Sequence, residues 1–239
     1  MVRDRKTEIA ENLAEVKEDI RLACLEAGRD PQEVKLIAIS KNFPVEDVEL
    51  AIAAGQEDFG ENRVQELTPK IDATSDYENV RWHLVGTLQR NKVKFVAGKV
   101  TMIHSVDSIR LIRQIDRISE ENNCISDVLL QVNISGEESK SGFEAGEIEE
   151  VIRFASEECP AVRICGLMTM APWYDNPDDT LPVFAEAQRL LHTYKEKLNL
   201  EHFDQLSMGM SHDYKQAIAC GATMVRIGTA IFGERDYSI

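Results

Sequence analysis

The chain contains no long hydrophobic run and no apolar leader. No apolar stretch in its 239 residues approaches the roughly 20 residues that a membrane-spanning helix needs. Residues 1–6 are mostly charged and lead into an amphipathic segment, whereas a secretory signal has an apolar core. We therefore expect a cytoplasmic protein with no membrane segment.

Cysteine is scarce and is not arranged in pairs. There are five cysteines and no CxxC spacing, and they stand at Cys24, Cys124, Cys159, Cys165 and Cys220. An odd number without paired spacing supports neither a disulfide framework nor a zinc site. We expect free, mostly buried thiols and no metal.

Several functional fingerprints are also missing. The sequence has no GxGxxG or GxxxxGK[ST] motif, no HExxH and no nucleophile elbow, which argues against dinucleotide, nucleoside triphosphate, zinc-protease and serine-hydrolase sites. The net charge of −15 argues against a nucleic-acid surface, which needs clustered cations. An acidic chain can still bind a small phosphate through backbone N–H groups at a helix start.

What the chain does contain is an unbroken strand-then-helix rhythm. A first helix is predicted within residues 1–28, where apolar residues recur at helical spacing before Gly28. Strands are predicted at 35–40, 57–60, 81–85, 101–105, 127–134, 162–168, 203–207 and 223–227. Helices are predicted at 45–54, 61–72, 89–97, 107–122, 144–157, 178–199 and 212–220. Eight βα units predict an α/β fold, a single (β/α)8 TIM-type barrel over 1–239 with an extra N-terminal helix. A doubly wound open sheet is the alternative, since sequence does not report strand order.

Lys41 closes the first strand. It follows the β-branched run 34–40, and Pro44 comes three residues later. The carboxyl edge of parallel strands is where such folds place their chemistry. A desolvated lysine there is neutral enough to attack a carbonyl, so Lys41 is a candidate Schiff-base nucleophile. A solvated lysine at a strand end is the simpler alternative for this residue taken alone.

Two corners rich in small residues follow the last two strands. Ser207, Gly209 and Ser211 lie after the seventh strand, and Gly228 and Thr229 end the eighth. In α/β barrels the loops after these two strands frequently bind phosphate. An ordinary helix N-cap by Ser211 would also explain the first corner.

Four further residues have both a functional and a structural interpretation. Arg226, penultimate in its strand, is either a fixed cation beneath a ligand or a buried ion-pair partner. His83 alternates with its neighbours and is either a ligand contact or a hydrogen-bonded core histidine. Asn62 is either a rim residue or a helix cap. Met168 belongs to a methionine set that either lines a cofactor or fills core gaps.

One ligand uses the lysine and both corners together. Closing the barrel makes the first and eighth strands neighbours, so Lys41 comes beside the two corners. A phosphate held at the corners and an aldehyde at Lys41 describe pyridoxal 5′-phosphate (PLP).

At this point the chain resembles a known family, the YggS/PROSC group of PLP-binding homeostasis proteins. The segments that carry the resemblance occur in the family's order and span nearly the whole chain: 38–41, 59–62, 82–92, 103–107, 166–170, 206–211 and 225–233. The resemblance implies a barrel like the N-terminal domain of alanine racemases, PLP fold type III. Departures at Asn42-Phe43, Thr87 and Arg90 lie beside the anchoring residues and bear on entrance shape and ligand exchange.

The resemblance also implies roles for the candidate residues. Lys41 would hold PLP as a Schiff base, and Arg226 would approach the pyridine nitrogen, keep it unprotonated and weaken the ring as an electron sink. The phosphate would be held by Ser207, Ser211, Gly228 and Thr229. We assign Asn62, His83, Met168 and Gly209 to the same cofactor site.

The predicted function is therefore a non-catalytic PLP carrier in vitamin B6 homeostasis, with apo PLP-dependent enzymes as partners and a monomer as the default state. The chain ends at Ile239, soon after the eighth unit, which leaves no room for the second acid/base domain of racemases. A PLP-dependent racemase or related enzyme, using His83 or a tyrosine as its second proton-transfer group, is one alternative. A cofactor-free Schiff-base aldolase is the other.

Overall fold

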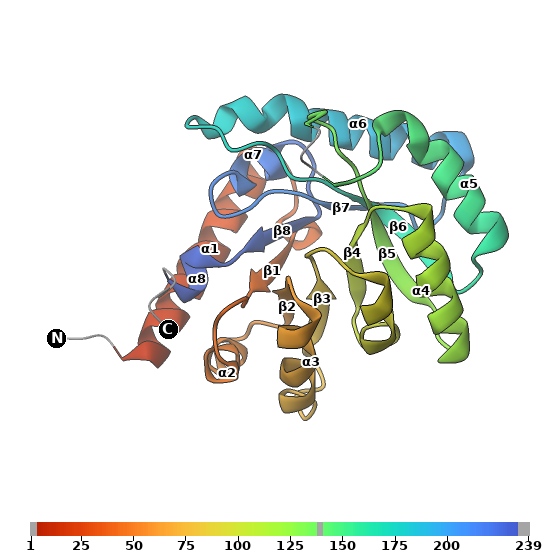
Figure 1. The fold of residues 1–239 in the computed structure, drawn as a ribbon. Helices are drawn as coiled ribbons and strands as arrows, with labels where there is room; N and C mark the ends of the chain where they lie inside the picture. Colours follow the sequence, from red (N-terminus) through yellow and green to blue (C-terminus); the bar gives the residue numbers. More distant parts are fainter. Residues whose placement is uncertain (1–3, 138–140, 234–239) are drawn as a thin grey trace.

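A closed parallel barrel forms the centre of the molecule. The computed structural model describes residues 4–137 and 141–233. The eight strands follow one another around the barrel in sequence order, and β8 pairs with β1 (Figure 1). Their bounds are β1 Lys35–Ile39, β2 Asp58–Glu61, β3 Arg81–Leu84, β4 Met102–Val106, β5 Ser126–Gln131, β6 Val162–Met168, β7 Gln205–Ser207 and β8 Met224–Ile227. Closure confirms the predicted TIM-type barrel and excludes the open sheet.

Helices surround the strands and connect them. They are α1 Arg5–Glu26, α2 Val45–Ala53, α3 Val64–Ala73, α4 Ile109–Glu121, α5 Ile148–Glu158, α6 Leu181–Leu198, α7 Tyr214–Ala219 and α8 Thr229–Phe232. Four short 3-10 turns also occur: η1 Pro31–Glu33, η2 Arg90–Phe95, η3 Ala145–Glu147 and η4 Pro177–Thr180. The helix predicted at 89–97 is therefore only a 3-10 segment. The sequence pattern did not predict α8.

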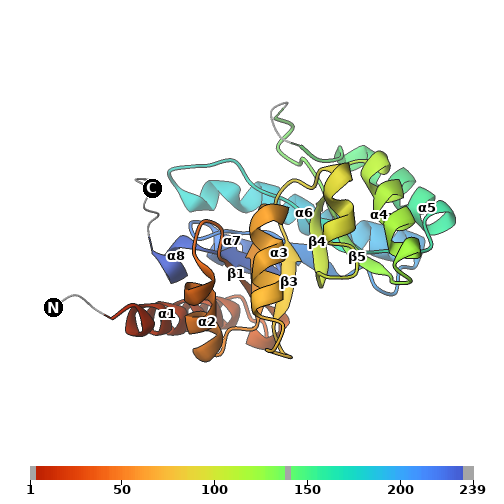
Figure 2. The same ribbon diagram turned by 60° about the horizontal axis from the view of Figure 1, so that its bottom comes forward.

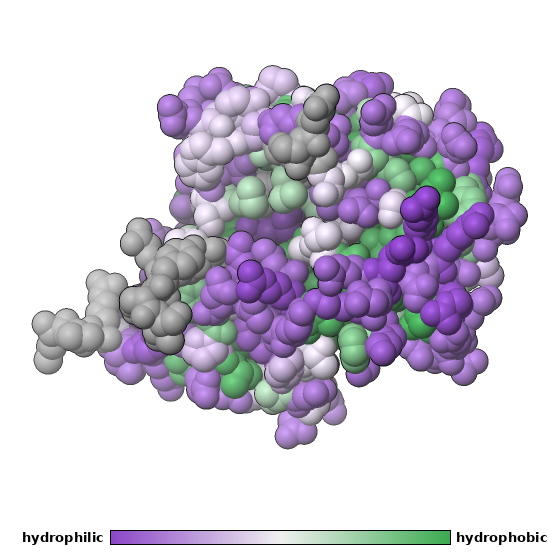
Figure 3. Space-filling model, in the orientation of Figure 1, coloured by the Kyte–Doolittle hydropathy of each residue, from purple (hydrophilic) through white to green (hydrophobic). Residues whose placement is uncertain are grey.

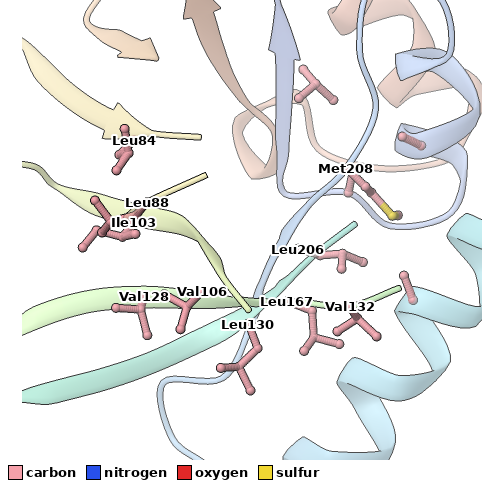
Figure 4. Close-up of a cluster of buried hydrophobic side chains, with 14 of the residues drawn as sticks. Leu84, Leu88, Ile103, Val106, Val128, Leu130, Val132, Leu167, Leu206 and Met208 are labelled. Atoms are coloured by element: carbon pink, nitrogen blue, oxygen red, sulfur yellow. The ribbon is translucent and has the colours of Figure 1, made fainter. Parts of the chain in front are cut away.

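Successive residues of a strand point to opposite faces, so every second side chain points into the barrel. These inward-pointing side chains fill the barrel interior. The interior cluster consists of Ile37, Ile39, Met102, Leu129, Cys165, Met168 and Met224, with Val85 packed against it. The alternate residues point outward into the layer between strands and helices. Figure 4 shows part of this outer layer, including Ile103, Val128 and Leu130. The filled interior confines any ligand to the ends of the barrel.

The first helix lies outside the barrel wall and joins the two ends of the chain. Helix α1 packs against α2, α7 and α8 (Figures 1 and 2). Its buried face is the predicted apolar stripe, which includes Ile9 and Leu13. Arg5 Nη2 donates a hydrogen bond to the Phe232 carbonyl at 2.9 Å, and Asn12 Nδ2 donates to the Ile231 carbonyl at 3.0 Å. Helix α8 has only four residues, so these contacts hold a helix too short to be stable alone.

On the face seen in Figure 3 the surface is mostly hydrophilic, with hydrophobic residues in patches between hydrophilic ones. None of the described helices is long and apolar enough to cross a membrane. Within the described ranges no three metal-ligating side chains gather into a possible ion site. All five cysteines are free thiols.

Candidate functional site

The carboxyl ends of three adjacent strands bring the predicted site together. Strand β8 pairs with β1 on one side and with β7 on the other. On β1, Ile37 and Ile39 point into the barrel, and Lys41 lies in the turn two residues after the strand ends. Lys41 is half-buried. The amine is thus attached at the rim next to the ends of β7 and β8.

A buried ion pair holds the backbone beside Lys41. Ser40, Glu61 and Lys70 lie between the barrel wall and α3, and each is less than a tenth exposed. Lys70 Nζ donates to the Ser40 carbonyl at 2.8 Å and contacts Glu61 Oε1 at 2.5 Å. The Ser40 hydroxyl donates to the same carboxylate oxygen at 2.7 Å. Burial raises the pKa of Glu61, against the opposing effects of Lys70 and Ser40.

The residue after Lys41 is fixed as well. Asn42 has a φ of +64°, in the left-handed region that asparagine tolerates better than most residues. Its backbone N–H donates to Glu66 Oε2 at 2.8 Å. Lys41 therefore stands on a short segment that is held on both sides, while its own side chain has four rotatable bonds.

Arg226 lies at the centre of the site, on the interior face of β8. It is 5% exposed. Its Nη1 donates to Ser207 Oγ at 2.6 Å, and its Nη2 donates to the Thr169 carbonyl at 3.1 Å. Burial lowers the pKa of the guanidinium to about 10, opposed by the charge of Asp213. Arg226 therefore remains a cation at neutral pH, and neutral oxygens hold it in place.

His83 lies deeper in the barrel and is fully buried. Its Nε2 is 3.0 Å from Asp58 Oδ1, and its Nδ1 is 3.0 Å from His104 Nε2. The Nδ1 of His104 is in turn 2.9 Å from Ser207 Oγ. Both ring nitrogens of His83 therefore bond to protein groups, which favours the interpretation of His83 as a hydrogen-bonded core histidine.

The first corner, after β7, is built around a glycine. Gly209 has a φ of +87°, and a Cβ there would lie 2.6 Å from the Cβ of Ala217. Its carbonyl accepts the backbone N–H of Arg226 at 3.0 Å, so the two corners are tied together. Ser211 is exposed and is not the helix cap, because α7 begins at Tyr214. Asp213 instead accepts the Met210 N–H at 2.6 Å and closes the turn.

The second corner lies directly against β1. Gly228 precedes α8, and a Cβ on it would lie 3.0 Å from the Ile39 carbonyl. Thr229 is the first residue of the helix and is exposed. The close packing of Gly228 on β1 brings this corner to the strand that Lys41 follows.

The remaining predicted residues have different surroundings. Met168 is buried in the interior cluster, whereas Met208 faces the outer layer and Met170 and Met210 are each 38% exposed. The four methionines therefore do not form one wall. Asn62 is half-buried at the rim, and α3 starts after Arg63, so Asn62 is not the helix cap.

Sequence reasoning missed Asp58, His104, Glu61 and Lys70. Only His104 gave a local signal, since it alternates with Met102 on the interior face of β4. The buried carboxylates and Lys70 looked like ordinary charged residues, and their partners lie on other strands or helices.

The donor set at this rim fits PLP. A primary amine at the rim, a buried guanidinium and two small-residue corners match an aldehyde, a ring nitrogen and a phosphate in chemical type. Ser211 and Thr229, which are predicted from the sequence to hold the phosphate, are exposed and therefore accessible to a ligand.

Comparison with known proteins agrees with this geometry. A sequence model of the N-terminal domain of alanine racemase matches residues 12–236. A pyridoxal phosphate homeostasis protein from Aquifex aeolicus is 43% identical over 95% of this chain and 98% of its own length. The Escherichia coli K12 protein of the same name is 40% identical over 97% and 98%. The structure of PipY from Synechococcus elongatus PCC7942, solved with PLP bound, has a TM-score of 0.83 and 36% identity, over 94% of this chain and all of that one. The chain therefore belongs to the family of pyridoxal phosphate homeostasis proteins, which share the barrel of the alanine racemase N-terminal domain.

Proposed function

We propose that this protein binds PLP as a Schiff base on Lys41 and serves as a non-catalytic carrier in vitamin B6 homeostasis. The observation that carries the proposal is that Lys41 follows the end of β1 at the carboxyl rim, where β1 adjoins the strand of Arg226. When bound, the cofactor supplies an aldehyde. Lys41 would hold the cofactor by condensation of its neutral amine with that aldehyde, with its two N–H protons and the carbonyl oxygen released as water.

The other residues bind and orient. Arg226 presents a fixed cation toward the ring, and Ser211, Gly228 and Thr229 hold the phosphate. Gly209 shapes the first corner, and Asn62 borders the rim. Met168 closes the bottom of the pocket as part of the interior cluster. Ser207 contributes through Arg226, since its hydroxyl already bonds to that guanidinium and to His104.

The carrier role is supported by the state of the groups that a racemase would use. Both ring nitrogens of His83 bond to protein partners. The hydroxyl of Tyr214 donates to Asp19 at 3.0 Å, and that of Tyr194 donates to the Ala145 carbonyl at 3.0 Å. His83 and these two tyrosines are therefore engaged elsewhere, and the relatives are named as homeostasis proteins.

An open rim suits a protein that releases its ligand. Thr87 and Arg90 after β3 are exposed, as are Ser211 and Thr229. We infer that the whole chain acts as one PLP-binding unit, a cytoplasmic monomer that exchanges PLP with free amines and with apo PLP-dependent enzymes.

Absorption and mass spectrometry test the assignment. Purified protein incubated with PLP should absorb in the near ultraviolet or violet, and borohydride reduction should leave the mass adduct on Lys41. Lys41→Ala should lose the adduct, whereas Lys94→Ala, at an exposed lysine of η2, should keep it. A reduced adduct on another lysine, or no absorption at all, would contradict the proposal, and the second result would favour the cofactor-free aldolase.

Two further measurements separate carrier from enzyme. A large excess of a free amine should extract PLP from the protein. Purified protein should not interconvert alanine or serine enantiomers. Lys41-dependent turnover would instead support the racemase alternative.

A further inference from the structure

A single hydrogen-bonded chain crosses the barrel interior, from the amino end to Arg226. It runs through Asp58 on β2, His83 on β3, His104 on β4 and Ser207 on β7, with consecutive distances of 3.0, 3.0, 2.9 and 2.6 Å. Every residue in it is 5% exposed or less. It connects residues up to 103 positions apart in the sequence, so only the closed barrel brings them together.

The carboxylate of Asp58 and the guanidinium of Arg226, at the two ends, determine which group donates in every hydrogen bond between them. An ionised aspartate can only accept, and a guanidinium can only donate. Arg226 Nη1 therefore donates to Ser207 Oγ, and His83 Nε2 donates to Asp58. With His83 neutral, its Nδ1 must accept from His104 Nε2–H, which leaves His104 Nδ1 to accept the proton of Ser207. Both histidines then carry their single proton on Nε2.

The charges around the chain favour these neutral rings. Asp58 also accepts from Arg81 Nε at 2.9 Å, and Lys35 Nζ lies 3.6 Å away from it. Burial works against ionisation of Asp58, but its hydrogen bonds from His83 and Arg81 outweigh burial and hold its pKa well below the ordinary value. Burial lowers the pKa of both histidines; His104 is lowered further by His83 and Arg226, whereas Asp58 opposes the shift in His83.

The Asp58 end of this hydrogen-bonded series lies near water. Asp58, Lys35 and Arg81 border a hollow of about 370 Å³ at the amino end of the barrel, opposite the rim that carries Lys41. The hydrogen-bonded series thus begins beside the exposed side chains of Lys35 and Arg81 and ends at the buried guanidinium of Arg226.

We propose that Asp58, His83, His104 and Ser207 are positioning residues that fix the direction in which Arg226 presents its remaining N–H groups to a bound ligand. Two of the five guanidinium N–H donors are directed at Ser207 Oγ and the Thr169 carbonyl, so the plane of the group is determined. Breaking one link frees Arg226 to rotate and leaves a buried donor or acceptor unpaired. The ligand-binding half of this proposal rests on the proposed function; the proton arrangement does not.

Nitrogen-15 NMR of the cofactor-free protein tests the proton arrangement alone. Long-range ¹H–¹⁵N spectra should show His83 and His104 as neutral Nε2–H tautomers that do not change between pH 6 and pH 8. Signals are assigned with single variants of each histidine. A doubly protonated His83, an Nδ1–H tautomer at either ring, or titration within this range would overturn the assigned polarity.

Ligand titrations with two variants of one residue test the positioning role. In His104→Gln the amide can donate to His83 and accept from Ser207, so PLP affinity should remain within about threefold of the parent protein. His104→Leu lacks both groups and should weaken PLP binding about tenfold or more. Met102→Leu, a packing change on the same face of β4, should bind PLP like the parent.

These outcomes separate the two proposals. Equal affinity and equal absorption spectra in His104→Leu and His104→Gln, with both variants folded by circular dichroism, would overturn the positioning role. If the parent protein binds no PLP, the proposed function fails, and the NMR spectra still decide whether the interior chain has the stated polarity.

Discussion

Two buried polar networks support the two basic groups of the site, and they are built differently. Outside the barrel wall, Ser40, Glu61 and Lys70 form a charged cluster that holds the backbone next to Lys41. Inside, neutral rings and a hydroxyl hold the side chain of Arg226. Among the described residues, Glu61 Oε2 is the buried side-chain polar atom that has no hydrogen-bond partner. The outer network is therefore charged and contains an unpaired carboxylate oxygen, whereas the inner one leaves only N–H groups of Arg226 available.

The difference matches what each group has to do. In the proposed function Lys41 forms the bond to the ligand, and the contacts of the outer network hold the backbone beside it. Arg226 only has to stay in place, so its guanidinium itself is bonded. The first arrangement relies on one strong buried ion pair, and the second on a series of moderate hydrogen bonds.

Removal of Lys70 should have the largest effect on stability. In Lys70→Met the Glu61 carboxylate stays buried without its cation, and we expect the free energy of unfolding to fall by about 3–5 kcal/mol. The loss, measured by urea unfolding, should shrink at pH 5, because folded Glu61 can then bind a proton. The exposed Lys94→Met variant should change stability by about 0.5 kcal/mol or less. A loss in Lys70→Met no greater than in this control would show that the ion pair is not a buried charge.

The inner network should make the free energy of unfolding depend on pH. Because burial lowers the pKa of His83 and His104, the unfolded chain takes up protons below about pH 6.5 that the folded chain does not. The free energy of unfolding should therefore fall as pH decreases from 7 to 5, by up to about 1.4 kcal/mol per pH unit for each histidine. His104→Gln should give a shallower slope in the same measurement. An unchanged slope would mean that His104 is not held neutral.

A matched pair of serines compares the networks directly. Ser40 and Ser207 are both fully buried, and each hydroxyl contacts a charged side chain. Alanine at 207 leaves an Arg226 donor and a His104 nitrogen unpaired and should cost about 2–3 kcal/mol. Alanine at 40 should lower the free energy of unfolding by about 1 kcal/mol, because Lys70 still bonds to the carbonyl of residue 40 and to Glu61. The two losses should add in the double variant because the networks share no residue. Strong non-additivity would mean that they are one network.

The smallest expected effect concerns the backbone at the outer network. Alanine adopts a positive φ less readily than asparagine. Asn42→Ala should therefore lower the free energy of unfolding, measured by thermal or urea unfolding, by about 1 kcal/mol. Asn42→Gly relieves that conformational cost and should come closer to the parent. Equal losses in both variants would attribute the effect to the asparagine side chain instead.

Local patterns allowed most of the fold to be predicted. Short apolar stretches alternating with helical patterns predicted the eight strands, and the alternation of Trp82, His83 and Leu84 placed His83 on the face opposite to its neighbours. Cap chemistry was less reliable: Asn62 and Ser211 have the right side chains for N-caps, but the adjacent turns start the helices at later residues. Residues that directly follow strands are good candidates for a shared site, because barrel geometry brings the carboxyl ends of the strands to one rim.

The networks could not be predicted in the same way. The bond between His104 and Ser207 joins residues 103 positions apart, and that between His83 and Asp58 joins residues 25 apart. Register around the closed barrel decides these pairs, and no spacing in the sequence encodes it. Whether a buried histidine meets a ligand or another histidine is decided only in three dimensions.

The contact of α1 with α8 has a consequence for how the chain is made. A ribosome adds roughly 5–20 residues per second, so α1 emerges tens of seconds before the residues that complete α8. During that time Arg5 and Asn12 have no access to their acceptors near the end of the chain, and β1 lacks its neighbour β8. The seam of the barrel therefore closes after the other strands have been made, and Lys41 and the Gly228 corner, which flank that seam, come together only once β8 has been synthesised.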